Sequence, residues 1–108
     1  MRQALVLYDG QACGQLSESD DGVFSFAYSS DYLASSHAHP VSLTLPLRSE
    51  AYLSKTLFPF FDGLIPEGWL LSLASATFKL PIADRMGLLL ATGKDPIGAV
   101  SVEALPHE

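Results

Sequence analysis

Residues 23–28 limit the fold of this chain more than any other part of its 108 residues. Side chains alternate along this segment, so that one face carries the three aromatic residues Phe24, Phe26 and Tyr28. A period of two predicts a β-strand, and an aromatic face has to be covered by other elements. We therefore expect a sheet with one buried, aromatic face.

Two apolar runs precede this segment and predict further strands. Residues 4–8 form a β-like run that closes at Asp9-Gly10, and residues 11–16 can pair back on it. Asp-Gly between two such runs is a strong hairpin signal, because both residues tolerate the positive φ of a tight turn. Together with residues 23–28, these runs predict an antiparallel meander.

Two later segments also have strand patterns. Residues 41–45 alternate and stop at Pro46, which cannot donate to a sheet ladder, so we expect this strand to lie at an edge or to end there. Residues 97–102 predict a last strand that could close the sheet. Residues 30–34 have the length of a single helical turn.

Helical patterns are predicted from Tyr52 onward. Ser54 could cap a short helix that Pro59 interrupts. Pro66 suits the first position of a second helix that reaches about Phe78, because the first N–H groups of a helix have no intrahelical partner.

Charge and capping residues support the later helices. Glu67 in the first turn complements the helix dipole, and Asp84 can cap a third helix that stops at Gly93. Strands followed by short helices predict the α+β class. We expect one domain over residues 1–108, with a small antiparallel, partly barrel-like sheet and short helices packed on one side.

Composition limits the class of partner. Twelve acidic and six basic residues give a net charge of −6, and the basic residues are scattered, so we expect no direct contact with DNA or RNA. An acidic surface favours a basic protein partner. The single cysteine excludes an internal disulfide and fits a cytoplasmic protein. No apolar stretch is long enough for a membrane span.

No residue pattern predicts catalysis, a metal site or a cofactor. His37 and His39 lie in a loop, and two ligands do not make a zinc site. Phosphate-binding loops and nucleophile elbows are absent, so we do not expect an enzyme. Cys13 falls in a strand-like segment and is expected to be packed rather than reactive.

The predicted helix over residues 66–78 has more apolar residues than its own core requires. They cover a larger part of its circumference than one core-facing stripe. The mean hydropathy of +0.25 agrees with this surplus. Some of these side chains are therefore expected to face a partner.

Four motifs are spread along the chain: Leu45-Pro46-Leu47, FFDGLIPEG at residues 60–68, LLLATG at 88–93 and DPIGAV at 95–100. Together they resemble the N-terminal subdomain of HipA-family Ser/Thr kinase toxins. The resemblance covers nearly the whole chain. Its most specific part is the second motif followed by the G-x-D-x-x-G-A-V pattern of residues 93–100.

The resemblance implies a binding role. HipA-family proteins continue into a kinase, whose ATP-binding loop and catalytic aspartate have no counterpart in these 108 residues. A separate copy of the subdomain resembles HipS, which neutralises the shortened kinase HipT in HipBST toxin–antitoxin systems that also contain the DNA-binding protein HipB. The implied function is an antitoxin acting in trans. The alternative is a structural subdomain, or a fragment, of a HipA-like kinase.

Trp69 is the residue that we predict to make the main contact with the kinase. Tryptophan is enriched at interface hot spots, and a position early in a helix after a tight loop would let its ring project. Pro66 and Glu67 are expected to shape that loop, with Phe60 nearby. The competing interpretation places Trp69 in the core, since tryptophan is highly buried on average.

Overall fold

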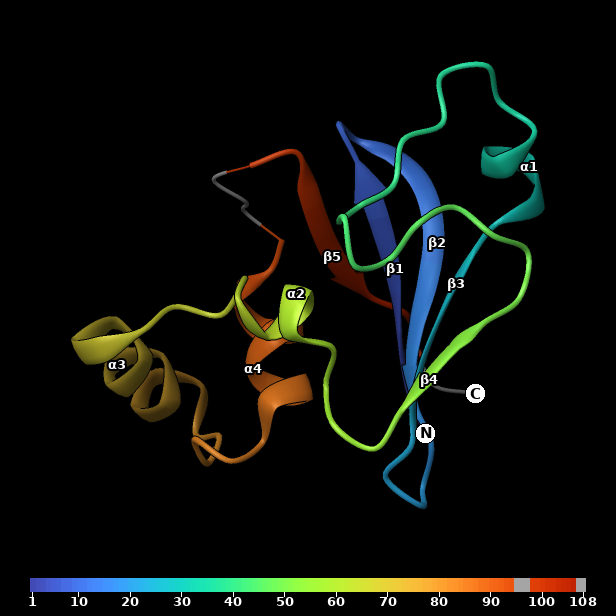
Figure 1. The fold of residues 1–108 in the computed structure, drawn as a ribbon. Helices are drawn as coiled ribbons and strands as arrows, with labels where there is room; N and C mark the ends of the chain where they lie inside the picture. Colours follow the sequence, from blue (N-terminus) through green and yellow to red (C-terminus); the bar gives the residue numbers. More distant parts are fainter. Residues whose placement is uncertain (95–97, 107–108) are drawn as a thin grey trace.

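A computed structural model describes residues 1–94 and 98–106 of the chain. Within these residues an antiparallel sheet has the strand order β4-β3-β2-β1-β5 and carries the helices between residues 59 and 92 on one side (Figure 1). The elements are β1 (Arg2–Tyr8), β2 (Gln11–Glu18), β3 (Phe24–Tyr28), α1 (Ser30–Leu33), β4 (Tyr52–Ser54), α2 (Pro59–Asp62), α3 (Gly68–Phe78), α4 (Arg85–Thr92) and β5 (Val100–Ala104). This confirms the predicted α+β class. The sheet curls without closing, because β4 and β5 remain at opposite edges.

The β1–β2 hairpin forms at the predicted turn. Asp9 and Gly10 have φ values of 50° and 81°, the left-handed conformation that a tight hairpin turn requires. The pairing shifts between Val6 and Leu7, where Cys13 is the extra residue of a bulge in β2. Since β3 pairs with the other side of β2, the predicted meander is confirmed.

The aromatic face of β3 lies at the centre of the core. Phe26 is fully buried, and its ring centroid lies 5.3 Å from that of Phe61 in α2. Helix α4 covers the same side of the sheet with buried residues Met86, Leu88 and Leu89. The sheet therefore buries one face against α2 and α4, as the alternation in β3 predicts.

The prediction of a strand over residues 41–45 is wrong. The segment forms a turn closed by an isolated bridge between Ser42 and Leu45, and the strand that pairs with β3 is β4. The buried Tyr28 hydroxyl explains the difference. It accepts a hydrogen bond from the Val41 N–H at 2.9 Å and donates to the Leu45 carbonyl. These backbone groups are thus satisfied by a side chain instead of a neighbouring strand.

The helical pattern begins later than predicted. Tyr52 lies in β4, where it pairs with Phe26. The Ser54 hydroxyl accepts from the Thr56 N–H at 3.2 Å and caps no helix. Pro59 does not interrupt a helix but begins α2, because a first position needs no N–H donor.

Helix α3 begins at Gly68 and not at Pro66. Gly68 has a φ of +60°, a left-handed conformation that cannot continue a right-handed helix toward the N-terminus. Glu67 is consequently the N-cap residue instead of a member of the first turn, and its side chain makes no capping hydrogen bond. The end of the helix at Phe78 agrees with the prediction.

The last two elements follow the sequence pattern closely. Asp84 Oδ1 accepts from the Gly87 N–H at 3.1 Å at the start of α4, and Gly93 is the C-cap. Strand β5 pairs with β1 along one edge of the sheet, so the predicted final strand is confirmed from Val100 onward without closing a barrel. Residues 95–97, which include the start of the DPIGAV motif, lie outside the described residues.

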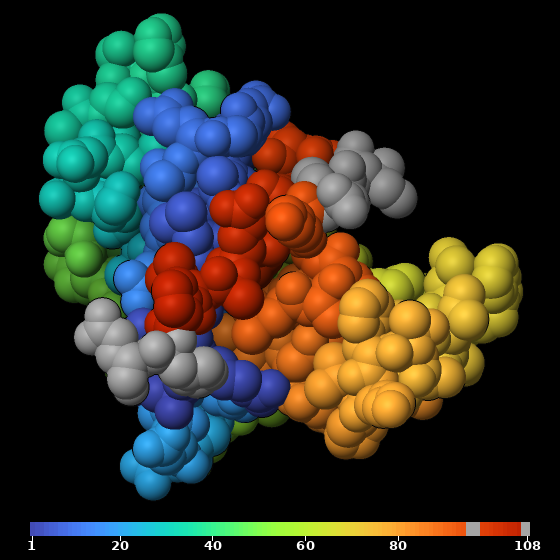
Figure 2. Space-filling model, turned by 180° about the vertical axis from the view of Figure 1, so that it is seen from behind, coloured from blue at the N-terminus to red at the C-terminus, as the bar shows by residue number. Residues whose placement is uncertain are grey.

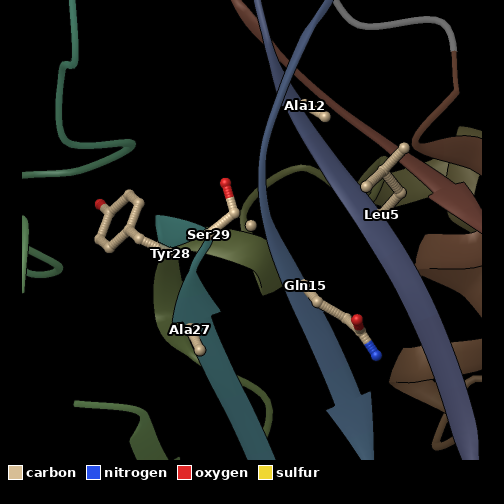
Figure 3. A pocket seen from close by; sticks show the side chains of 7 residues that line it. Leu5, Ala12, Gln15, Ala27, Tyr28 and Ser29 are labelled. Carbon is tan, nitrogen blue, oxygen red and sulfur yellow. The ribbon is translucent and has the colours of Figure 1, made fainter. Parts of the chain in front are cut away.

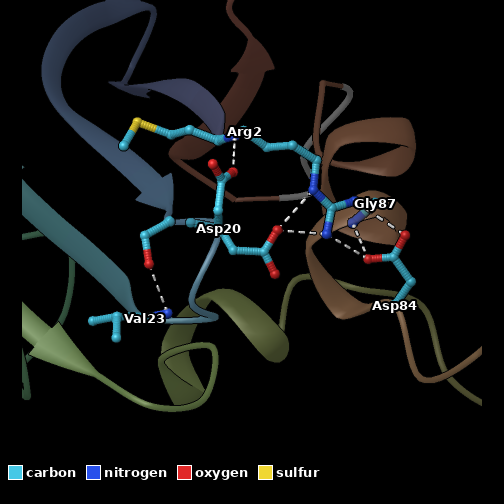
Figure 4. A network of polar contacts seen from close by, with 8 residues as sticks. Arg2, Asp20, Val23, Asp84 and Gly87 are labelled. Atoms are coloured by element: carbon cyan, nitrogen blue, oxygen red, sulfur yellow. Dashed lines mark hydrogen bonds and ion pairs between the residues drawn. The ribbon is translucent and has the colours of Figure 1, made fainter.

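A network around Arg2 joins the sheet to the helical layer (Figure 4). The Arg2 guanidinium donates to both carboxylate oxygens of Asp84, at 3.0 and 2.8 Å, and to Glu18 at 2.7 Å. The hydrogen bonds from Arg2 hold the pKa of the Asp84 carboxyl below its usual range. This one guanidinium therefore links β1, β2 and the start of α4.

Asp84→Asn should lower the free energy of unfolding by about 1–2 kcal/mol at neutral pH, because an amide loses the charge-assisted pair with Arg2 but can still cap α4. The pKa of Asp84 is lower in the folded state than in the unfolded state. The stabilisation that its carboxylate provides is therefore complete above the unfolded pKa of about 3.9 and is lost as pH falls through the lower folded value. Urea unfolding of both proteins across this pH range tests the claim. The exposed substitution Asp21→Asn is the control. If the difference in the free energy of unfolding between wild type and Asp84→Asn does not shrink in acid, the prediction is contradicted.

Tyr28→Phe should lower the free energy of unfolding by about 1–3 kcal/mol, because it leaves the Val41 N–H and the Leu45 carbonyl without their buried partner. Tyr52→Phe is a matched control, since its hydroxyl bonds the Pro46 carbonyl at an exposed site and should cost less than about 0.5 kcal/mol. Chemical denaturation measures both. Equal losses would mean that Tyr28 does not anchor the turn.

Candidate functional site

Helix α3 stands apart from the rest of the molecule. In the space-filling view it projects from the body as the yellow-to-amber arm (Figure 2). It packs on α4, and Ala74 is the one buried residue within its span. Its C-terminal end is fixed by Lys79, which has a left-handed φ of 56°, and by the Leu80 N–H, which donates to the Ser75 carbonyl at 3.0 Å.

The side of α3 that faces away from α4 is apolar and exposed. Trp69 is 73% exposed, Leu73 54% and Leu70 48%. Neighbouring turns of one helix bring these residues together with exposed Ala76 and Thr77 on one face. We call these five residues the outer stripe: Trp69, Leu70, Leu73, Ala76 and Thr77.

The outer stripe carries no charge that would explain its exposure. The span Gly68–Phe78 contains no acidic or basic residue. A helix that is apolar on its outer side as well as its inner side is normally buried on both. An exposed tryptophan beside two exposed leucines is the type of apolar patch that interaction surfaces have, so the outer stripe is a candidate site.

Three of the four predicted contact residues lie together at the start of α3. Pro66 is half-buried in the preceding loop, Glu67 is the exposed N-cap, and Trp69 follows within the first turn. Phe60 is placed differently. It belongs to α2, where its half-buried ring packs edge-on against Phe61 with centroids 5.2 Å apart.

The exposure of Trp69 excludes the interpretation that it is a core residue. The apolar surplus predicted for residues 66–78 includes Leu70 and Leu73, the other large members of the outer stripe, although neither was predicted as a contact residue. Sequence reasoning missed Leu43, which is 96% exposed at the tip of the 41–45 turn. The signal available for the two stripe leucines was the absence of charge along the whole helix.

The described residues hold little that could perform chemistry. Residues 1–94 and 98–106 contain no group of His, Cys, Asp and Glu side chains that could hold a metal ion. Burial raises the pKa of the Cys13 thiol to about 11, so this cysteine is a poor nucleophile at neutral pH. The Asp62 carboxylate accepts a hydrogen bond from Arg85 Nε at 2.6 Å and is thus part of an ion pair. None of the described helices has both the length and the apolarity of a bilayer span.

A shallow hollow lies on the sheet between β1, β2 and β3 (Figure 3). Its volume is about 260 Å³, and it is lined by Leu5, Ala12, Gly14, Gln15, Ala27, Tyr28 and Ser29. Tyr28 is the one described lining residue with an ionisable side chain, but its buried hydroxyl bonds Val41 and Leu45 instead of facing the hollow (Figure 3), and burial raises its pKa to about 12. The hollow therefore offers no acid or base for catalysis near neutral pH, and the outer stripe is the stronger candidate site.

Comparison with known proteins identifies relatives of two lengths. A Haemophilus influenzae protein named "Uncharacterized protein" is 34% identical over 103 residues, which cover 95% of this chain and 92% of that protein. "Putative kinase Y4mE" of Sinorhizobium fredii is 32% identical over 103 residues, again 95% of this chain. The chain spans about a quarter of that second relative, 24% of its length.

A solved structure and a family model agree with each other. The structure titled "N-terminal domain of HipA toxin" is similar over 100% of this chain and 96% of its own, with a TM-score of 0.75 and 29% identity. Residues 4–103 match the family model described as the HipA N-terminal domain, which is not the kinase domain. The chain therefore belongs to the HipA N-terminal domain family.

Proposed function

We propose that this chain is an antitoxin that binds a HipT-like Ser/Thr kinase toxin in trans and holds it inactive. The proposal places it in a tripartite system of the HipBST type, together with a HipB-like DNA-binding protein. The observation that carries it is the exposed, uncharged outer stripe of α3 on a domain of the HipA N-terminal family.

The lengths of the relatives support an action in trans. The matched region makes up 92% of the Haemophilus protein but 24% of the Sinorhizobium protein, which carries the name of a kinase. The same domain therefore occurs both nearly alone and as part of a longer, kinase-named chain. A surface that packs on a kinase within one chain can make the same contact between two chains.

The outer stripe has the character of such a contact. Trp69 provides a large, rigid apolar side chain, which loses little conformational freedom when a partner buries it. Tryptophans of this kind contribute much of the binding free energy at many interfaces. Leu70 and Leu73 surround it and would exclude water from its rim. Pro66 and Glu67 hold the loop from which the helix starts, whereas Phe60 supports this region through the core residue Phe61.

The remaining surface suits a cytoplasmic protein complex better than nucleic acid. Net charge is −6, and the six basic residues do not form a stripe along the sequence. Contact with operator DNA is therefore assigned to other chains of the complex. The role proposed here is binding without catalysis.

One observation favours a second candidate function. Because the domain forms part of a longer, kinase-named relative, it could serve as a structural subdomain that such a kinase needs for folding or assembly. The two functions predict opposite effects on the kinase. An antitoxin lowers the activity of a kinase that is already folded, whereas a structural subdomain raises it.

Co-expression with the HipT-like kinase from the same gene cluster should restore growth, and the two chains should co-purify. Adding this chain in equimolar excess to the folded kinase should abolish most of its autophosphorylation, since the outer stripe is available without rearrangement. Radiolabelled phosphate transfer measures this effect. An unchanged rate refutes the antitoxin function, and an increased rate favours the structural one.

Trp69→Ala should leave the melting temperature within about 2 °C of wild type, because the side chain is exposed. It should weaken kinase binding by at least about 2 kcal/mol, roughly thirtyfold. Calorimetry and thermal unfolding on one preparation measure both effects. Leu43→Ala, also at a highly exposed site, is the matched control and should change neither value.

Two results would remove Trp69 from the proposed contact. The first is an unfolded variant, which would mean that the side chain supports the domain itself. The second is a folded variant that still neutralises the kinase fully.

A further inference from the structure

Helix α3 has few of the interactions that keep a short helix folded. Isolated helices shorter than about 12–15 residues are marginal in water, and α3 has 11 residues. The span Gly68–Phe78 contains no charged residue, so no ion pair between successive turns supports it. The stability of α3 therefore has to come from its packing on the rest of the domain.

This packing involves little buried surface. Ala74 is the one buried residue of α3, and Leu71 is half-buried against the core. Helix α4, by contrast, buries the run from Met86 to Leu89 beneath the sheet. Local opening requires less free energy where fewer apolar contacts are lost. Helix α3, which projects from the body (Figure 2), is therefore held less firmly than α4.

The chain on both sides of α3 is anchored in the core. Ile65 is buried, and the half-buried Leu80 packs against the core residues. Residues 66–79, which lie between these anchors, can therefore lose their helical structure while the sheet and α4 stay in place. Such an opening exposes much less surface than unfolding of the domain does.

The N-terminal end of α3 is held more weakly than the C-terminal end. Gly68, with its φ of +60°, has more backbone freedom than other residues. The Leu71 N–H reaches the Glu67 carbonyl only at 3.4 Å, which is long for a helical hydrogen bond. At the other end, the Leu80 N–H donates to the Ser75 carbonyl at 3.0 Å, and the Ser75 hydroxyl donates to the Leu80 carbonyl.

We propose that α3 is a hinged arm that opens from its N-terminal end, independently of the sheet and of α4, with Gly68 as the hinge. The turn that opens first carries Trp69. The side chain proposed as the main contact with the kinase therefore lies in the part of α3 that is most easily released. The opening itself is a property of the chain alone.

Native-state hydrogen exchange of the whole chain, followed for each amide by NMR, tests the proposal. After correction for intrinsic rates, amides of α3 should exchange at least about tenfold faster than central amides of α4. Low concentrations of urea should accelerate exchange in α4 but hardly in α3, because a local opening exposes little surface. Within α3, the amides of Leu71 and Ser72 should exchange before those of Thr77 and Phe78.

Substitutions in the core distinguish local opening of α3 from unfolding of the domain. Tyr28→Phe weakens a part of the molecule that stays folded when α3 opens. It should therefore accelerate exchange in α4 about fivefold or more and leave exchange in α3 unchanged. Val6→Ala, at a fully buried site in β1, is a second variant of this kind and should act in the same way.

A matched pair within α3 tests whether the helix itself opens. Ser72 is exposed and lies outside the outer stripe. The opening equilibrium of α3 should be about fivefold larger in Ser72→Gly than in Ser72→Ala, because glycine has the lower helix propensity. The exposed substitution Ala51→Gly lies outside every helix and strand and should leave exchange in α3 unchanged.

Three results would overturn the proposal. The first is an equal free energy of opening for α3 and α4. The second is equal acceleration of both helices by the two core substitutions, which would mean that α3 unfolds only with the domain. The third is exchange that begins at the C-terminal end of α3, or that does not differ between the two Ser72 variants.

One consequence rests on the proposed function. A kinase that binds the outer stripe holds α3 closed, so saturation with the folded kinase should slow exchange in α3 at least about tenfold. If α3 opens in the free chain but the kinase does not slow its exchange, the contact with the kinase is refuted and the hinged arm is not. The two proposals can therefore fail separately.

Discussion

The contact between Phe26 and Phe61 is the interaction on which the rest of the structure depends. Their ring centroids lie 5.3 Å apart, and both side chains are fully buried. This contact joins the middle of the sheet to α2, and α4 fills the remaining part of the same face with Met86, Leu88 and Leu89. Because these two helices occupy the core face, α3 packs on α4 and keeps its outer stripe exposed.

The Arg2 network fixes the orientation of this helical layer. Arg2 and Asp84 are 82 positions apart in sequence, yet two hydrogen bonds join them, and Asp84 also caps α4. An added Cβ at Gly87 would lie 2.4 Å from Asp84 Oδ2 and would displace this carboxylate from its contacts with Arg2. The segment from Phe78 to Asp84 is short, so a fixed start of α4 also restricts where α3 can project.

Several polar side chains in the described residues stabilise the structure. Arg85 pairs with Asp62, and the Tyr28 and Tyr32 hydroxyls bond backbone groups of the loop between α1 and β4. Helix α3, by contrast, leaves apolar surface in contact with water, because it has no charged residue and carries an exposed tryptophan. A surface of this kind gains free energy when a partner removes it from water, and the proposed contact of α3 with the kinase follows from that property.

Local patterns determined much of the fold, because they depend on neighbours in the sequence. The Asp9-Gly10 turn, the alternation in β3 and the Asp84 cap each act over a few residues. The 41–45 turn was not predictable in this way, since its backbone bonds the distant Tyr28 hydroxyl. The sequence by itself determined that α3 would have an apolar surplus around Trp69, and the tertiary structure decided which side would carry it. A helix that is apolar all round has no intrinsic inner face, so only packing on α4, held in place by Arg2 from the opposite end of the chain, selects the side left to solvent.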